Sequence, residues 1–145
     1  MGVLAWAGCV AVIGWAAALS VNDIRELRLP NRLTVGGALA IVIIAVCCGR
    51  GLSAMLGALA LGLLYLLVHL VAPAGLGAGD VKLALGVGAL TGALGAGIWA
   101  MAAVAAPMAT AVLGLVAAAR GYRGPIPHGP SMLTASVGAA ALAVF

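Results

Sequence analysis

The chain has 145 residues, of which 66% are hydrophobic and only 7% charged, with a formal net charge of +4. Soluble domains typically carry roughly a quarter charged residues, so this composition excludes an ordinary water-exposed globule. The basic residues lie in short segments between apolar runs and form no basic-aromatic surface for a polynucleotide. We therefore expect the lipid bilayer as the solvent and no nucleic acid as a partner.

Long apolar runs without alternation predict helices, because in lipid every backbone polar group must be satisfied internally. A span needs about 20 apolar residues, so the chain has room for five or six. We predict an all-α integral membrane protein, a six-transmembrane-helix bundle forming one membrane-embedded domain over residues 1–145. The predicted spans cover about 3–20, 33–48, 52–71, 81–92, 98–119 and 130–145. The fourth would rise only about 18 Å, so we expect a short helix that does not cross unaided.

The first apolar run is followed by the most polar segment of the chain. No Lys or Arg precedes the run, and three arginines follow it, at Arg25, Arg28 and Arg32. A secretory signal carries its positive charge on the other side, so we expect a retained first span. Pro30 restrains Leu29 from helical geometry, and Asn31 is expected to cap the second helix.

The distribution of basic residues predicts the orientation. With the N-terminus outside, six basic side chains fall in the cytoplasm and one, Arg50, outside. The six are Arg25, Arg28, Arg32, Lys82, Arg120 and Arg123. This follows the positive-inside rule, whereas fusing residues 81–119 into one span would place two arginines outside. The six-span arrangement is therefore favoured.

Two other residue types have ordinary explanations. Cys9, Cys47 and Cys48 form no CxxC pair, so we expect small apolar fillers rather than a metal site or a disulfide. His69, at the end of the third span, is expected to be a hydrogen-bonded interfacial histidine.

The chain contains only two aspartates. Asp23 follows the first span and Asp80 precedes the fourth, with two complete spans between them, so both are predicted at the same membrane surface. An ionisable group near hydrocarbon is a functional hypothesis by default. The alternative is that each aspartate caps a helix or pairs with a neighbouring basic residue. Glu26, the third acid, lies among arginines, which favours a surface ion pair.

The segment Gly77-Ala78-Gly79-Asp80 presents the second aspartate at the start of a helix, where the dipole favours the ionised form. Gly77 and Gly79 are expected to let the backbone approach closely and to adopt conformations closed to other residues. Two carboxylates within a few Å would share a proton. One would draw a proton from water while the other protonates or hydrogen-bonds the scissile carbonyl. We therefore predict Asp23 and Asp80 as the catalytic pair.

Two basic residues are candidates for a supporting role. Lys82 is expected either to steady the charge of Asp80 or to contact substrate, although snorkelling at the interface would also explain it. Arg25 is a candidate for guiding an acidic part of the substrate, although orientation alone would explain it.

Three stretches of the chain resemble bacterial type IV prepilin peptidases, membrane aspartyl peptidases with a Gly-x-Gly-Asp motif. The stretches are Asp23-Ile24-Arg25 continuing to Leu29-Pro30-Asn31, then Gly77-Ala78-Gly79-Asp80-Val81-Lys82-Leu83, and last Ile126-Pro127-His128-Gly129-Pro130. They occur in the family's order and frame the chain from residue 22 to 130. His128 stands where the family usually has an aromatic residue, a departure that would alter substrate fit.

The resemblance implies a reaction and a place. Such enzymes remove a short basic leader from pilin-like precursors after a glycine, at the cytoplasmic face of the bacterial plasma membrane. By this analogy Asp23 and Asp80 are catalytic, and neither a metal nor a cofactor is required. Larger members carry two Cys-x-x-Cys pairs and methylate the new N-terminus. Because this chain has neither those cysteines nor the extra length, we expect a peptidase-only form like those serving Flp/Tad-type pili.

The sequence is also compatible with two functions of other classes. One is a small transporter or proton-relay subunit, which would place its acids near the bilayer midplane. The other is a non-enzymatic subunit of a pilus or secretion machine, whose polar loops dock partners. Aspartates at span ends on one face fit a surface-cleaving site better.

Overall fold

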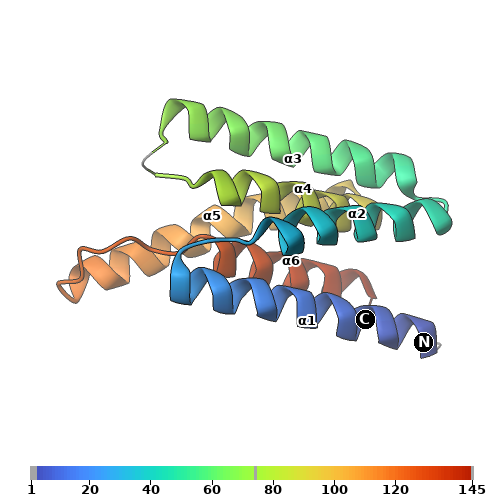
Figure 1. Ribbon diagram of the computed structural model, residues 1–145, viewed down its shortest axis with the longest axis horizontal. Helices are drawn as coiled ribbons and strands as arrows, with labels where there is room; N and C mark the ends of the chain where they lie inside the picture. Colours follow the sequence, from blue (N-terminus) through green and yellow to red (C-terminus); the bar gives the residue numbers. More distant parts are fainter. Residues whose placement is uncertain (1–2, 74, 145) are drawn as a thin grey trace.

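The computed structural model describes residues 3–73 and 75–144, which form six α-helices. They are α1 (Val3–Glu26), α2 (Asn31–Cys47), α3 (Gly51–Val71), α4 (Ala78–Leu94), α5 (Ala96–Ala119) and α6 (Gly129–Val144). The helices run side by side, and the α1–α2, α3–α4 and α5–α6 connections lie at the same end (Figure 1). The predicted all-α architecture is confirmed for the described residues.

Three of the helices are long and apolar enough to cross a membrane. They include Trp6–Glu26 of α1, Gly51–Val71 and Ala96–Ala119, whereas α2 and α6 are apolar but shorter. Large apolar side chains project outward from α3, where Leu70 is 68% exposed and Val71 85%. An apolar surface of this extent is unfavourable in water and suits acyl chains. Three of the described helices therefore have the length, and the described surface has the apolar character, of a membrane protein.

Helix α4 lies at the centre of the bundle and packs against α2, α3, α5 and α6. Its small residues permit this close enclosure. A Cβ at Gly57 of α3 would collide with the carbonyl oxygen of Gly88 of α4, and the reverse substitution would collide equally. One turn further along α4, a Cβ at Gly92 would lie 2.7 Å from the carbonyl oxygen of Ser53. Small residues bring the α3 and α4 backbones into direct contact, as is common between helices in membranes.

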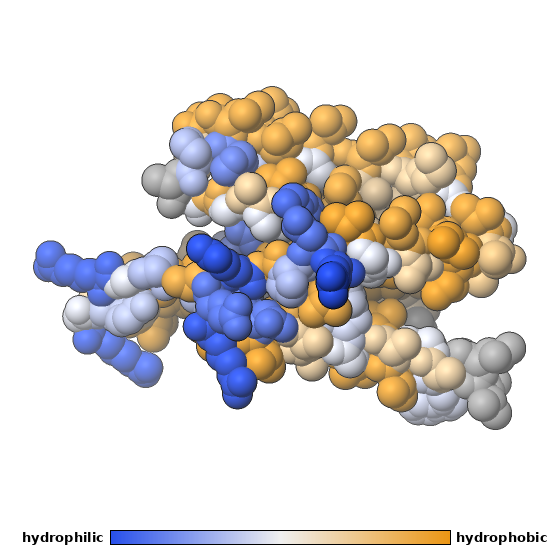
Figure 2. Space-filling model, in the orientation of Figure 1, coloured by the Kyte–Doolittle hydropathy of each residue, from blue (hydrophilic) through white to orange (hydrophobic). Residues whose placement is uncertain are grey.

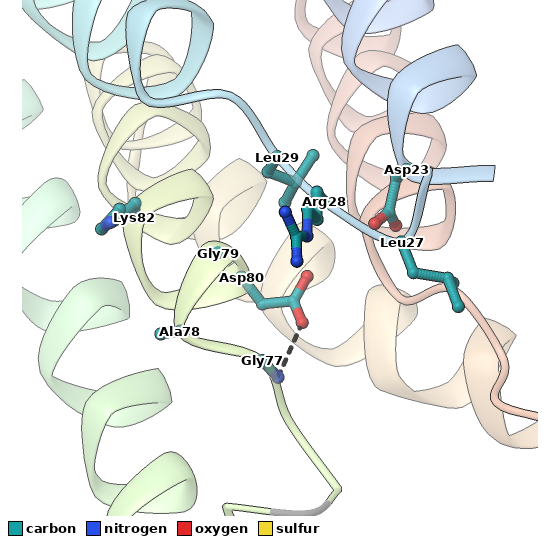
Figure 3. A pocket seen from close by; sticks show the side chains of 9 residues that line it. All are labelled: Asp23, Leu27, Arg28, Leu29, Gly77, Ala78, Gly79, Asp80 and Lys82. Atoms are coloured by element: carbon teal, nitrogen blue, oxygen red, sulfur yellow. Dashed lines mark hydrogen bonds between the residues drawn. The ribbon is translucent and has the colours of Figure 1, made fainter. Parts of the chain in front are cut away.

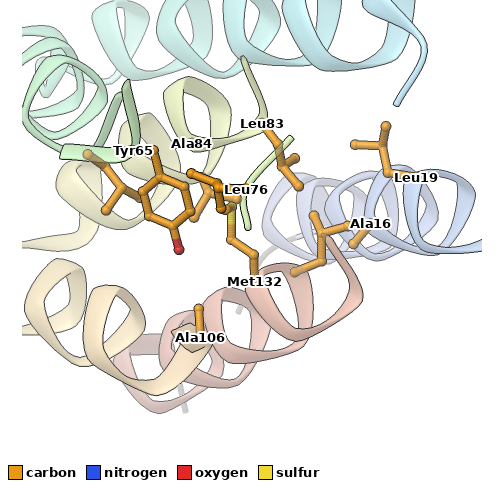
Figure 4. Close-up of a cluster of buried hydrophobic side chains, with 11 residues drawn as sticks. Ala16, Leu19, Tyr65, Leu76, Leu83, Ala84, Ala106 and Met132 are labelled. Atoms are coloured by element: carbon orange, nitrogen blue, oxygen red, sulfur yellow. The ribbon is translucent and has the colours of Figure 1, made fainter. Parts of the chain in front are cut away.

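A cluster of buried apolar side chains joins five helices (Figure 4). Its members include Ala16, Leu19, Tyr65, Leu83, Ala84, Ala106 and Met132. Leu19 precedes Asp23 by one turn, and Leu83 follows Asp80 by slightly less than one turn. Residues three or four apart share a helix face, so burial of this cluster also sets the direction of the two aspartates.

Two predicted helix boundaries were wrong near the aspartates. Helix α1 continues through Glu26, so Asp23 lies within its last turns and not after the span. The side-chain amide of Asn22 donates to the carbonyl oxygen of Ala18 at 2.8 Å within this helix. Helix α2 follows an extended Pro30 with ψ 130°, and Asn31 is its first residue rather than its cap.

The fourth helix is also longer than predicted. It has 17 residues, as many as α2, so it is not distinctively short. The chain breaks before α5 at Gly95 alone, whose φ of 130° suits glycine, and not over the whole of residues 95–97.

The predictions for the three cysteines and for His69 had different outcomes. Cys47 and Cys48 are exposed and Cys9 is half-buried, so none of the three is fully buried among the helices, and their role as small apolar fillers stays a prediction. The hydrogen-bonded His69 is confirmed, because its Nδ1 lies 2.7 Å from the carbonyl oxygen of Leu76.

Candidate active site

Asp23 is buried near the end of α1, with 6% of its surface exposed. Its Oδ2 accepts a hydrogen bond from the backbone N–H of Gly129 at 3.0 Å. Gly129 is the first residue of α6, and the first N–H groups of a helix have no partner within it and favour a negative charge. A Cβ at this position would lie 2.6 Å from Oδ2, so only glycine lets the backbone come so close.

Asp80 occupies the first turn of α4 and is 8% exposed. Its Oδ2 accepts the backbone N–H of Gly77 at 3.1 Å. A carboxylate at the third helical position that reaches back to the N–H before the helix is half of a capping box. The local sequence therefore orients Asp80, whereas Asp23 depends on a helix 106 residues further along the chain.

Both aspartates line one cavity of about 290 Å³ at the polar end of the bundle (Figure 3). The lining residues are Asp23, Leu27, Arg28, Leu29, Gly77, Ala78, Gly79, Asp80 and Lys82. The two carboxylates come from separate helices to this cavity. Both lie at the same end of the bundle, which agrees with the expected shared membrane surface, although that surface itself stays a prediction.

The two carboxyl groups also interact electrostatically. Asp80 lies at the polar end of the bundle, outside the three membrane-length helices, and its pKa is raised from 3.8 to about 6. Burial is the largest cause, the negative charge of Asp23 acts in the same direction, and the hydrogen bond from Gly77 opposes both. A carboxyl group with such a pKa exchanges protons near neutrality, as acid–base chemistry requires.

The glycines beside Asp80 act differently from the prediction. Gly77 has φ −72° and ψ 149°, an ordinary extended conformation, and Gly79 lies within α4. The prediction of special backbone conformations was therefore wrong. Close approach does apply, because a Cβ at Gly79 would lie 3.3 Å from the Cβ of Leu29, and one at Gly77 3.3 Å from Oδ2 of Asp80.

The basic residues that were candidates for a supporting role differ in where they lie relative to the carboxylates. The ammonium group of Lys82 donates to Oδ1 of Asn31 at 2.8 Å, and in Figure 3 its side chain points away from both carboxylates. Arg25 is exposed and does not line the cavity, whereas Arg28 does. Glu26 is exposed and also lies outside the lining.

Two features of the site were not predicted from the sequence. Gly129 was visible as part of a Pro-flanked stretch, but its bond to Asp23 depends on the packing of α6 beside α1. Leu27 has φ 50°, a left-handed conformation that is uncommon for leucine, and it lines the cavity. No sequence signal marks that conformation. In the described part of the chain, no three His, Cys, Asp or Glu side chains are grouped so as to hold a metal ion.

The fold and the cavity define a helical membrane protein with two buried carboxylates at one end of the bundle. The chain belongs to the type IV leader peptidase family, which it matches over residues 10–144. This confirms the family resemblance of the three sequence stretches and indicates a protease of the leader peptidase kind. Comparisons with curated proteins and with solved structures gave no match.

Proposed function

We propose that the chain is an aspartic endopeptidase that removes the leader from prepilin-like precursors, with Asp23 and Asp80 as the catalytic pair. One observation carries the proposal: two buried carboxylates from separate helices line one cavity, and the charge of one raises the pKa of the other. Membership of the leader peptidase family supports the same conclusion.

The reaction needs one carboxylate and one carboxylic acid. The ionised group takes a proton from water as the water oxygen attacks the scissile carbonyl carbon, and the protonated group donates to the carbonyl oxygen. Collapse of the tetrahedral intermediate breaks the C–N bond. The departing amine takes the proton that the first group removed from water, and the re-formed carbonyl returns its proton to the second group. Because the two groups interact, their titration belongs to the pair. The N–H groups of Gly77 and Gly129 orient the carboxylates.

The substrate and the setting follow from the family and the charge pattern. We propose precursors with a short basic leader and an apolar segment, cut at the cytoplasmic face of a bacterial plasma membrane. The six helices would all be membrane passages, with the cavity and the first turn of α4 at the cytoplasmic end, outside the hydrocarbon core and beside the arginine-rich connection. We further propose peptidase activity without methyl transfer. A proton relay is less well supported, because both carboxylates lie at helix ends and not midway along them.

Substitution of the pair tests this proposal directly. We expect Asp23→Asn and Asp80→Asn each to slow leader removal from a co-expressed pilin-like precursor by about 10²–10⁴-fold, the usual contribution of acid–base groups. Cleavage is followed by the mobility shift of the precursor. Glu26→Gln is the matched control, since Glu26 is an exposed acid on the same helix as Asp23 and lies outside the cavity. Full leader removal by either aspartate variant would contradict the proposal.

A further inference from the structure

A second polar cluster lies outside the cavity and has no part in the proposed chemistry. His128, in the α5–α6 connection, places its Nε2 2.9 Å from Oη of Tyr65 on α3 and its Nδ1 2.7 Å from Oγ1 of Thr110 on α5. The Tyr65 and His128 rings also pack together, with centroids 5.5 Å apart. One imidazole therefore joins α3 and α5 to the connection that precedes α6.

The hydrogen-bond directions in this cluster are mutually consistent. Oγ1 of Thr110 also bonds the carbonyl oxygen of Ala106 at 3.2 Å, which can only accept. If the threonine proton goes there, Nδ1–H of His128 donates to Thr110, and Nε2 accepts from the hydroxyl of Tyr65. This arrangement uses a neutral imidazole, and burial lowers the pKa of His128 accordingly. Every donor then has an acceptor.

The cluster lies next to the backbone that holds Asp23. The carbonyl oxygen of His128 accepts the N–H of Met132 at 3.1 Å and so begins the hydrogen bonding of α6. The next residue is Gly129, whose N–H bonds Asp23. The position of His128 therefore determines where that N–H points.

We propose that His128 is a positioning residue for Asp23, because its bonds to Tyr65 and Thr110 fix the start of α6 and hold the Gly129 N–H on the carboxylate. The inference rests on the proposed function, in which Asp23 is catalytic. In this role His128 restrains the backbone at the start of α6, and the restraint needs the hydroxyl groups of both Tyr65 and Thr110.

Three variants remove the bonds separately. His128→Phe keeps a ring but no ring nitrogen, whereas Tyr65→Phe and Thr110→Val each delete one hydroxyl partner. Misplacing a catalytic group by about 1 Å can cost 10²-fold, so we expect His128→Phe to lower kcat about ten- to a hundredfold. Each hydroxyl deletion should lower kcat about three- to tenfold. KM should stay within about twofold, because the change affects the chemical step rather than substrate binding.

A second measurement reports on the hydrogen bond between the Gly129 N–H and Asp23. Hydrogen exchange of the Gly129 amide, followed by NMR in detergent micelles, should accelerate in all three variants, because opening of the start of α6 exposes this amide. Thr134→Val and Tyr122→Phe are the matched controls. The hydroxyl of Thr134 bonds the carbonyl oxygen of Pro130 one turn earlier, as that of Thr110 does with Ala106, but Thr134 is exposed. The hydroxyl of Tyr122 donates to the carbonyl oxygen of Pro125 in an exposed connection. Neither should change kcat or the exchange of Gly129.

The outcomes separate this inference from the proposed function. Reduced kcat together with faster Gly129 exchange supports the positioning role. Wild-type kcat in all three variants, or reduced kcat with unchanged Gly129 exchange, overturns it. If Asp23→Asn retains full activity, the proposed function fails instead, whatever the three variants do.

Discussion

At the scale of single residues, each buried carboxylate is held by one glycine N–H. Gly77 holds Asp80 from within the same turn, and Gly129 holds Asp23 from the start of another helix. A carboxylate can accept several hydrogen bonds, so one N–H orients each group and leaves capacity for water or substrate. This arrangement favours function over stability, since burial of a charged group opposes folding.

The burial of Asp80 predicts a gain in stability from Asp80→Asn. Its folded-state pKa of about 6 exceeds the ordinary value of 3.8, so ionisation destabilises the folded state. The contribution of Asp80 to the stability of the wild type is full below pH 3.8 and is lost as the pH rises through 6. At pH 8 we expect the variant to be more stable by at most about 3 kcal/mol. Thermal unfolding in micelles, followed by tryptophan fluorescence, measures the difference.

The pH dependence of this gain identifies its cause. The asparagine oxygen still accepts the N–H of Gly77, so only the ionisation is removed. The gain should vanish below pH 3.8, where Asp80 is protonated in both states. Glu26→Gln, at an exposed acid, should show no such trend. An Asp80→Asn variant no more stable than the wild type at pH 8 would refute the electrostatic explanation.

At the scale of helices, the contact between α3 and α4 sets the position of Asp80. The colliding groups at Gly57 and Gly88 are backbone atoms, which no rotamer change can move aside. Any larger residue at either position must push the two helices apart. Because α4 carries Asp80 in its first turn, such a shift also changes the cavity.

We expect Gly88→Ala to lower the free energy of unfolding by about 1–3 kcal/mol, the usual effect of overpacking. Leader cleavage should fall as well. Gly36→Ala on α2 is the matched control, because no atom lies within 4 Å of the added Cβ, and alanine favours the helix by up to about 1 kcal/mol. Thermal unfolding of both variants in the same micelles tests this. Equal stability of Gly88→Ala and the wild type would show that the helices separate freely.

The contact between Gly57 and Gly88 could not be predicted from the sequence, whereas other features of the fold could. The apolar runs predicted the helices, and the even number of spans predicted that Asp23 and Asp80 lie at one end. Local chemistry beside Asp80 was also visible, because its partner lies three residues away. The partner of Asp23, the cluster around His128 and the meeting of Gly57 with Gly88 all join residues distant in sequence. Spacing carries no signal for such contacts.

At the scale of the whole molecule, polar side chains gather at the end of the bundle that holds the cavity, and apolar side chains cover the rest of the visible face (Figure 2). The α2–α3 connection, with Cys48 and Arg50, lies at the opposite end (Figure 1). If the positive-inside rule sets the orientation, the cavity faces the cytoplasm and Cys48 faces outward.

Cysteine labelling in whole cells tests this orientation. A variant that retains only Cys48, which is exposed, should react with a membrane-impermeant maleimide in intact cells. A second variant, with Arg123→Cys as its only cysteine in the exposed α5–α6 connection, should react only after permeabilisation. Retained leader cleavage in both variants confirms that each is folded. The reverse labelling pattern would place the carboxylates outside the cell, away from newly made precursors, and the cytoplasmic site would have to be abandoned.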